Sequence, residues 1–262
     1  MNDRILTALP VYNEASHVRK VLDQVLQHAD DILVVNDGST DNTEATLADF
    51  SELINVENHS VNRGYGAALK TAFDYAVRYG YDVLVTIDCD GQHQPRLIKD
   101  IAAQIDNPEN PVNLVSGSRY LKSFDINSVA PEDRRRINMK ITKCLNEQLG
   151  FDITDAFCGF KAYRVSSLPD LDITDNGYAM PLQLWVQAAD LDWNISEYPI
   201  PLVYLDEERS FGGSLDDADV RLTHYRGVLN TELSRRGMNQ RFTADCGQGG
   251  ADRQQRRAAA RE

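Results

Sequence analysis

The chain has 262 residues, of which 42% are hydrophobic, and its formal net charge is −13. This length and composition fit one large α/β domain with an apolar core and exclude wholesale disorder. The excess of carboxylates argues against a general nucleic-acid-binding protein, which needs a basic surface facing phosphates. We therefore expect no nucleic-acid partner.

The cysteines and the apolar segments bear on the cellular compartment. Cys89, Cys144, Cys158 and Cys246 show neither a paired spacing nor a neighbouring histidine at zinc-site spacing, which favours free thiols in a reducing compartment. We find no signal-peptide segment and no apolar run near the roughly 20 residues that span a bilayer. We expect a cytoplasmic protein, with peripheral contact at the inner face of the membrane as the only membrane association.

Short β-branched runs alternate with helical periodicities over the first 120 residues. This repeated order predicts an α/β fold, a three-layer sandwich whose mostly parallel central sheet is covered by helices on both faces. In such sheets ligands bind beyond the carboxyl ends of the strands. The predicted strands are Arg4–Leu9, Asp31–Val35, Leu53–Glu57, Asp82–Ile87 and Asn113–Ser116, and the predicted helices are 14–29, one capped by Asp41 with Glu44, one from Gly64 to about Gly80, and one with Pro95 in its first turn.

The pattern changes from about residue 121. One helix carries Ile137, Ile141, Leu145 and Leu149 on one face, and its other face is basic. The basic side chains, Arg134, Arg135, Lys140 and Lys143, either rest on a membrane and meet a lipid phosphate or offset nearby acids. A helix near Met180–Ala189 and a strand near Trp193–Pro199 follow, and the tail 237–262 is expected to be disordered.

The strongest chemical signal lies in Val83–Gln92, where an apolar strand delivers Asp88 and Asp90 to the edge at which ligands bind. Strand alternation puts both carboxylates on the same side. Two acids held this close repel each other unless a cation lies between or beside them. Mg²⁺ or Mn²⁺ bridging to a substrate diphosphate fits, with Gln92 as a neutral ligand, although Asp-x-Asp also occurs in ordinary turns.

Two segments in the first half carry weaker signals. Asp37 ends the second strand and either accepts hydrogen bonds from a base or ribose or shapes the turn with Ser39. The glycines Gly64 and Gly66 either expose backbone amides to an anion or allow tight packing of the helix on the sheet. The third glycine of the dinucleotide-binding fingerprint is absent, so a Rossmann dehydrogenase is disfavoured.

A further segment, Asp152–Lys161, follows the amphipathic basic helix. Its acids, Asp152 and Asp155, either orient or deprotonate an acceptor, and Lys161 is suited to a phosphate. The spacing alone favours a solvated loop.

Taken in order, six segments resemble the nucleotide-sugar glycosyltransferases of family 2, which have the GT-A fold. The likeness covers about residues 4–215 and is closest to the branch with dolichol-phosphate mannosyltransferase and bacterial polyprenyl-phosphate glycosyltransferases. No segment is specific alone, but six in the family's order are. They are Leu9–Glu14, Asn36–Asp41, Asn62–Gly66, Asp88–Gln92, Gly117–Tyr120 and Asp155–Lys161.

The resemblance implies a metal-dependent, inverting transfer of a hexose from a nucleotide-diphosphate sugar of the GDP-mannose or UDP-glucose type. The expected acceptor is polyprenyl or dolichyl phosphate. It implies one domain over 1–236, with a nucleotide-binding part to about 120 and an acceptor part beyond. The implied roles are Pro10, Tyr12, Glu14 and Asp37 for the nucleoside; Asp88, Asp90 and Gln92 for Mg²⁺ or Mn²⁺ and the diphosphate; Arg119 for a phosphate; Asp155 near the reaction centre; and Arg209 and Ser214 in a late loop that closes over the diphosphate.

The chemistry is expected to involve Asp155, Asp90 and Arg119. Asp155 acts as a general base if the acceptor is a hydroxyl, and only orients groups if the acceptor is a lipid phosphate. The branch has a lysine after the late-loop serine, whereas this chain has Leu215 followed by Asp216 and Asp217. The alternatives are a family 2 transferase acting on a hydroxyl acceptor, a non-catalytic nucleotide-sugar-binding module, and a nucleotidyltransferase, which lacks its Gly-rich basic signature here.

Overall fold

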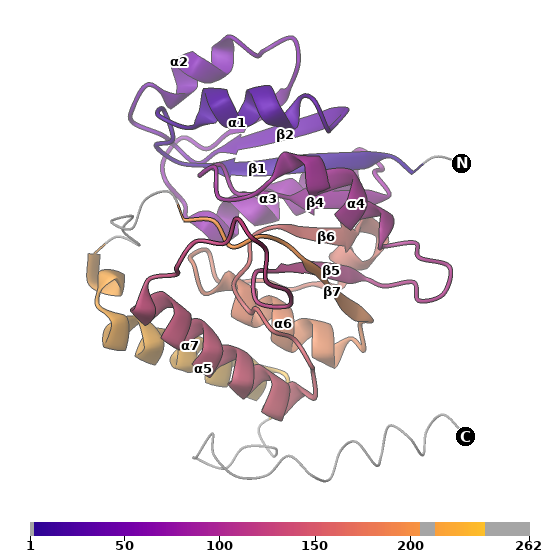
Figure 1. Cartoon of the computed structure of the whole chain (residues 1–262), viewed down its shortest axis with the longest axis vertical. Coiled ribbons are helices and arrows are strands. Elements are labelled where there is room, and N and C mark those ends of the chain that lie inside the picture. Colours follow the sequence, from indigo (N-terminus) through magenta and orange to yellow (C-terminus); the bar gives the residue numbers. More distant parts are fainter. Residues whose placement is uncertain (1–2, 205–212, 239–262) are drawn as a thin grey trace.

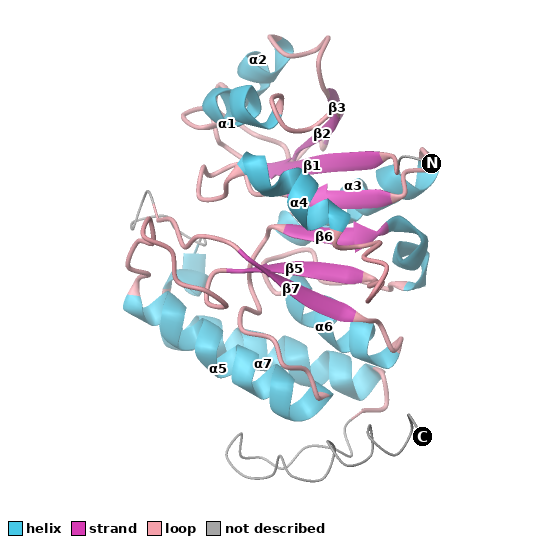
Figure 2. Cartoon of the chain, turned by 45° about the vertical axis from the view of Figure 1, so that its right-hand side comes forward, coloured by secondary structure: helices cyan, strands magenta, loops and turns pink. Residues whose placement is uncertain are grey.

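Seven strands form one sheet within residues 3–204 and 213–238, the part of the chain that the computed structural model describes. Their order is β3-β2-β1-β4-β6-β5-β7, and β6 runs antiparallel to both of its neighbours while the other pairs are parallel (Figure 2). The strands are β1 Ile5–Val11, β2 Asp31–Asn36, β3 Asn55–Asn58, β4 Val83–Thr86, β5 Leu114–Ser118, β6 Lys161–Arg164 and β7 Ile195–Pro199.

Helices cover both faces of this sheet, because successive strand side chains point to opposite sides. In β1, Leu6 and Ala8 join the core under α3, α5, α6 and α7, whereas Leu9 and Val11 join the core under α1, α2 and α4. The predicted three-layer α/β fold is therefore confirmed (Figure 1). The helices are α1 Val18–Val25, α2 Thr43–Ala48, α3 Tyr65–Arg78, α4 Ile98–Ala103, α5 Glu132–Leu149, α6 Met180–Asp190 and α7 Ala218–Arg235, with 3₁₀ turns η1 Pro95–Leu97, η2 Val165–Asp170 and η3 Gly213–Asp216.

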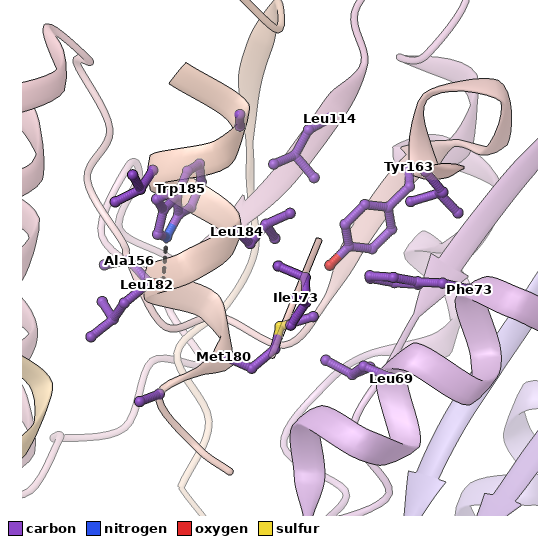
Figure 3. Packing of buried hydrophobic residues seen from close by; sticks show 14 of the residues in the cluster. Leu69, Phe73, Leu114, Ala156, Tyr163, Ile173, Met180, Leu182, Leu184 and Trp185 are labelled. Atoms are coloured by element: carbon purple, nitrogen blue, oxygen red, sulfur yellow. Dashed lines mark hydrogen bonds between the residues drawn. The ribbon is translucent and has the colours of Figure 1, made fainter. Parts of the chain in front are cut away.

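The core beneath α6 fixes the segment that precedes β6. Trp185 is fully buried, and its indole Nε1 donates a hydrogen bond of 2.9 Å to the carbonyl oxygen of Ala156 (Figure 3). Across the same core, the ring of Phe73 on α3 packs at 5.0 Å from the ring of Tyr163 on β6. These contacts hold residues 155–160 in place between the sheet and α6.

Two elements, β6 and α7, were not predicted from the sequence. The strand β6 has only four residues and carries charged side chains at both ends, so it shows no apolar run. The helix α7 buries Arg221 and Glu232 among its apolar side chains, and these charges break the amphipathic pattern. The elements that were predicted differ from the observed ones mainly at their ends, as in α1, which is shorter than the predicted 14–29.

Further predictions need correction or lie outside the described residues. The helix α2 has Asn42 as its N-cap, and Asp41 bridges the backbone amides of Thr43 and Ala15 instead of capping the helix. Most of the tail, 239–262, lies outside the described residues. The division into a nucleotide-binding and an acceptor part stays a prediction, and one sheet runs through both parts.

A buried carboxylate joins α7 to α6. Glu232 has no exposed surface, and it accepts hydrogen bonds of 2.9 Å from Gln183 Nε2 and 2.7 Å from Gln187 Nε2. The carbonyl oxygens of these two glutamines accept the backbone amides of Asp175 and Asp172, each at 2.7 Å. Helix α7 therefore supports the loop 172–178 through α6.

We predict that Glu232→Ala lowers the free energy of unfolding by about 2–4 kcal/mol, because the buried donors around this carboxylate lose their acceptor. Urea unfolding measures the change. The matched control is Glu147→Ala, which removes a partly exposed helical glutamate paired with Lys143 and should change the value by less than about 0.5 kcal/mol. Equal values for both variants would contradict the prediction.

Candidate active site

A pocket of about 470 Å³ opens at the carboxyl ends of the parallel strands β1, β2 and β4. Its position follows from the fold, because loops leaving neighbouring parallel strands diverge at this edge. The pocket brings together most of the site residues predicted from the sequence. Those in its wall are Pro10, Tyr12, Glu14, Asp37, Asp88, Asp90, Gln92 and Arg119.

The two aspartates of the acidic motif both line this pocket. Strand β4 ends at Thr86, so Asp88 and Asp90 lie in the turn beyond it. Strand alternation, the reason expected from the sequence, is therefore not what brings them to the same side. The turn is held by the backbone amide of Gln92, which donates to Asp90 Oδ1 at 3.0 Å, and by Gly91 with φ 73°.

The donor set of this turn suits a cation that binds together with a diphosphate. Among the described residues, no group of three His, Cys, Asp or Glu side chains could hold a metal ion by itself. Mg²⁺ and ions like it need only one or two protein carboxylates, because substrate phosphates and water supply their other ligands. The carboxylates of Asp88 and Asp90 and the amide oxygen of Gln92 fit that requirement.

Asp37 is buried and already has several hydrogen-bond donors around it. Its Oδ1 accepts from His59 Nδ1 at 2.6 Å and from the amide of Arg63 at 2.9 Å, and its Oδ2 accepts from the amide of Gly64 at 2.7 Å. The carboxylate thus braces the turn that leads into α3. The carboxylate oxygens of Asp37 can accept further hydrogen bonds, and contact with a nucleoside stays a prediction.

The two glycines at the start of α3 allow a close approach of backbone to backbone. Gly64 has φ 100°, and a Cβ atom on it would overlap the carbonyl oxygen of Asn176. A Cβ atom on Gly66 would lie 2.6 Å from the carbonyl oxygen of Asp175. The two glycines therefore allow tight packing of α3, although α3 packs here on the loop before α6 and not on the sheet.

A buried ion pair fixes Arg119 against Asp155. The guanidinium donates from Nε to Oδ2 at 2.6 Å and from Nη2 to Oδ1 at 2.9 Å, and Asn138 Nδ2 donates to Oδ1 at 2.7 Å. Burial raises the pKa of Asp155, but Arg119 and the hydrogen bond from Asn138 lower it more, to about 2. Asp155 is fully buried, so the solvated-loop alternative is wrong for this residue.

This environment makes Asp155 a poor general base, because a carboxylate with so low a pKa has little affinity for a proton. Asp155 also lies behind the pocket wall, and Arg119 stands in front of it. The geometry favours an orienting role for Asp155.

Lys161 is also buried, and it is part of the pocket wall. Its Nζ donates to Ser116 Oγ at 2.6 Å and lies 5.0 Å from the centre of the Trp185 ring. Burial lowers the pKa of this lysine.

The late loop lies partly outside the described residues, and Arg209 lies outside them. Ser214 is exposed in η3 and is not part of the pocket wall. The departure of this chain from the family's lysine has a structural use, because Asp217 caps α7 by accepting the amides of Asp219 and Val220. Arg221 on α7 lines the pocket and donates from Nη1 to the carbonyl oxygen of Leu215 at 2.7 Å.

Several polar residues of the pocket wall were not predicted from the sequence, among them Tyr65, His93 and Arg221. Tyr65 lies between the two glycines, and His93 directly follows Gln92. Their places within or beside motifs already identified were a usable signal. Arg221 gave none, because its helix was not predicted.

Comparison with known proteins assigns the family. Residues 7–172 match the family model described as glycosyl transferase family 2. The chain belongs to that family. It is 30% identical over 232 residues to the undecaprenyl-phosphate mannosyltransferase of Micrococcus luteus, covering 85% of this chain and 93% of the relative. It is 31% identical to the polyprenol monophosphomannose synthase of Mycolicibacterium smegmatis, covering 80% of each.

These relatives confirm the resemblance to the polyprenyl-phosphate branch, and this family 2 protein is a glycosyltransferase. Its fold is similar to that of glucosyl-3-phosphoglycerate synthase from Mycobacterium tuberculosis. The two agree with a TM-score of 0.66 at 21% identity, over 90% of this chain and 81% of that one. That protein was crystallised with Mn²⁺, uridine diphosphate and glucosyl-3-phosphoglycerate. The GT-A fold expected from the sequence is confirmed.

We predict that Asp155→Asn lowers the free energy of unfolding of this glycosyltransferase by about 3–5 kcal/mol at pH 7, because Arg119 keeps its buried charge and loses its counter-charge. The folded-state pKa is depressed from 3.8 to about 2, so the ion pair stabilises the fold fully above 3.8. The advantage of the wild type over the variant should therefore shrink as the pH falls through about 2.

Urea unfolding over a pH series measures both effects. Asp152→Asn, three residues away on an exposed side chain, is the matched control and should stay within about 0.5 kcal/mol of the wild type. A variant as stable as the wild type at pH 7 would show that the pair contributes nothing.

Proposed function

We propose that this glycosyltransferase moves a hexose, with inversion and with Mg²⁺ or Mn²⁺, from a nucleotide-diphosphate sugar to a polyprenyl or dolichyl phosphate. The observation that carries the proposal is one pocket lined by acidic and by basic side chains that come from different elements. Asp88 and Asp90, here called the acidic wall, follow β4, whereas Arg119, which follows β5, and Arg134, on α5, are called the basic wall. The relatives from Micrococcus luteus and Mycolicibacterium smegmatis, both named for the mannosylation of polyprenyl phosphates or polyprenols, support the acceptor class.

The acidic wall suits the donor. Asp88, Asp90 and Gln92 would hold the divalent ion, which neutralises the charge that grows on the leaving diphosphate. Beside them, Tyr12 at the end of β1 exposes 43% of its surface and offers a ring to the base, while Glu14 and Asp37 offer carboxylate oxygens. The structurally similar protein crystallised with Mn²⁺ and uridine diphosphate supports this assignment.

The basic wall suits a phosphate acceptor. Arg119, Arg134 and Asn138 line the pocket there, and Asp155 orients Arg119 from behind. A lipid phosphate is ionised near pH 7, so its oxygen attacks the anomeric carbon without a base. The bond from that carbon to the diphosphate breaks in the same in-line step. The low pKa of Asp155 favours this acceptor over a hydroxyl, which would need a proton acceptor.

We further propose that α5 and the segment before it touch an anionic membrane surface. None of the described helices is both long and apolar enough to cross a bilayer. On α5, Arg135 and Lys140 are exposed next to Met139, and the preceding segment exposes Ile126 and Val129. Basic side chains beside exposed apolar ones are typical of interfacial membrane contacts.

We predict that Asp90→Asn lowers turnover by about 100-fold or more, because the ion then loses one of its two carboxylates while charge develops on the leaving group. Release of nucleotide from GDP-mannose and UDP-glucose, with undecaprenyl phosphate and Mn²⁺, measures it. Asp74→Asn on α3, an exposed residue, is the matched control and should leave turnover unchanged. Turnover that continues in excess chelator would contradict the metal requirement.

We predict that Arg135→Gln with Lys140→Gln weakens binding to anionic vesicles by about 2 kcal/mol, roughly 30-fold in partition coefficient. Sedimentation with phosphatidylglycerol vesicles measures it, and neutral phosphatidylcholine vesicles give the baseline. The double variant Lys20→Gln with Lys99→Gln removes the same charge from the opposite face of the sheet and should bind like the wild type. Equal pelleting of all three proteins would count against this surface.

A further inference from the structure

The carboxylate of Asp88 is held by three groups that come from three separate segments. Tyr65 Oη, in the first residue of α3, donates to Oδ1 at 3.1 Å. His93 Nε2, in the turn after the acidic motif, lies 3.3 Å from Oδ2. Gly159, in the segment before β6, closes the remaining side, because a Cβ atom there would overlap both carboxylate oxygens.

The contact from Tyr65 is rigid. The backbone of the preceding Gly64 is held by Asp37, and the ring of Tyr65 stacks on that of Tyr178 at 5.7 Å with an interplanar angle of 19°. A carboxylate oxygen can only accept, so the hydroxyl of Tyr65 is the hydrogen-bond donor in this contact.

The contact from His93 has a structural cost. Its side chain is only 5% exposed and packs against the ring of Phe160, with 5.5 Å between ring centres. A carboxylate only accepts hydrogen bonds, so Nε2 carries a proton and donates to Asp88. The other ring nitrogen, Nδ1, is buried without a hydrogen-bond partner in the described part of the chain. A buried polar atom left without a partner is unfavourable for stability.

Two of these groups orient the carboxylate, and the third restricts it. A ligand already held in one rotamer loses little conformational entropy when an ion binds. Two donors on Asp88 also reduce its repulsion with the nearby carboxylate of Asp90. Loss of a group that orients a metal ligand in this way typically lowers metal affinity by roughly 10- to 100-fold.

We propose that Tyr65 and His93 are positioning residues that hold Asp88 in the orientation in which it binds the divalent ion of the donor complex. This inference rests on the proposed function, because that proposal makes Asp88 a metal ligand. The competing arrangement is one in which the two donors occupy the oxygens that the ion needs. The two arrangements predict opposite changes in metal affinity.

Calorimetric titration of Mn²⁺ into the full chain, alone and with saturating GDP or UDP, separates them without measuring turnover. We expect Tyr65→Phe, which removes only the hydroxyl, to raise the Kd for Mn²⁺ about tenfold or more. Tyr79→Phe makes the same change on an exposed side chain just after the far end of α3 and should leave the Kd unchanged. His93→Leu should raise the Kd like Tyr65→Phe, and His93→Gln, which keeps an N–H donor, should restore part of the affinity.

Asp88→Asn distinguishes the failure of this inference from the failure of the proposed function. If the wild type binds Mn²⁺, Asp88→Asn does not, and Tyr65→Phe and His93→Leu keep the wild-type Kd, the positioning role is overturned and the metal site stands. A lower Kd in Tyr65→Phe overturns it as well. A wild type that binds no Mn²⁺ under any of these conditions overturns both proposals. Melting temperatures without metal confirm that each variant is folded.

Discussion

The buried ion pair between Arg119 and Asp155 is the interaction on which the pocket depends. It joins the residue directly after β5 to the segment before β6, and Asn138 adds a contact from α5. The next residue, Ala156, is bound to α6 through Trp185. A charge pair with so little exposed surface is stable only with good geometry and satisfied hydrogen bonds, and both conditions are met here. These contacts connect the sheet, α5 and α6 around the guanidinium of Arg119.

The pocket separates charges of opposite sign. Transfer between a diphosphate and a phosphate must bring two anionic substrates together, and their repulsion opposes it. In the proposed reaction, a divalent ion at Asp88 and Asp90 would neutralise one of the two substrates, and the arginines of the basic wall would neutralise the other. The ion pair with Asp155 keeps Arg119 charged and oriented. The same pair lowers the pKa of Asp155, so this carboxylate has no proton to exchange.

The walls of the pocket are supported from behind by other buried polar groups. Glu232 on α7 holds Gln183 and Gln187, and these hold the loop 172–178 that packs on the glycines of α3. Lys161, itself a residue of the pocket wall, is held by Ser116 and lies against the ring of Trp185. Such networks are rigid when every member has its partners. They place the substrate-facing side chains on fixed supports, which catalysis by positioning requires.

The sequence by itself determined the alternating α/β order, the acidic pair beyond the fourth strand and the family, because these depend on local periodicity and on short segments in a fixed order. Only the tertiary structure decided that β6 is antiparallel and that α7 docks through Glu232. It likewise decided that Asp155 is a buried partner of Arg119, 36 residues away in the chain, and that Tyr65 reaches Asp88. The reason is physical. Periodicity reports which side of an element is apolar, whereas the partner of a buried charge, and with it the pKa, depends on residues that only the folded chain brings together.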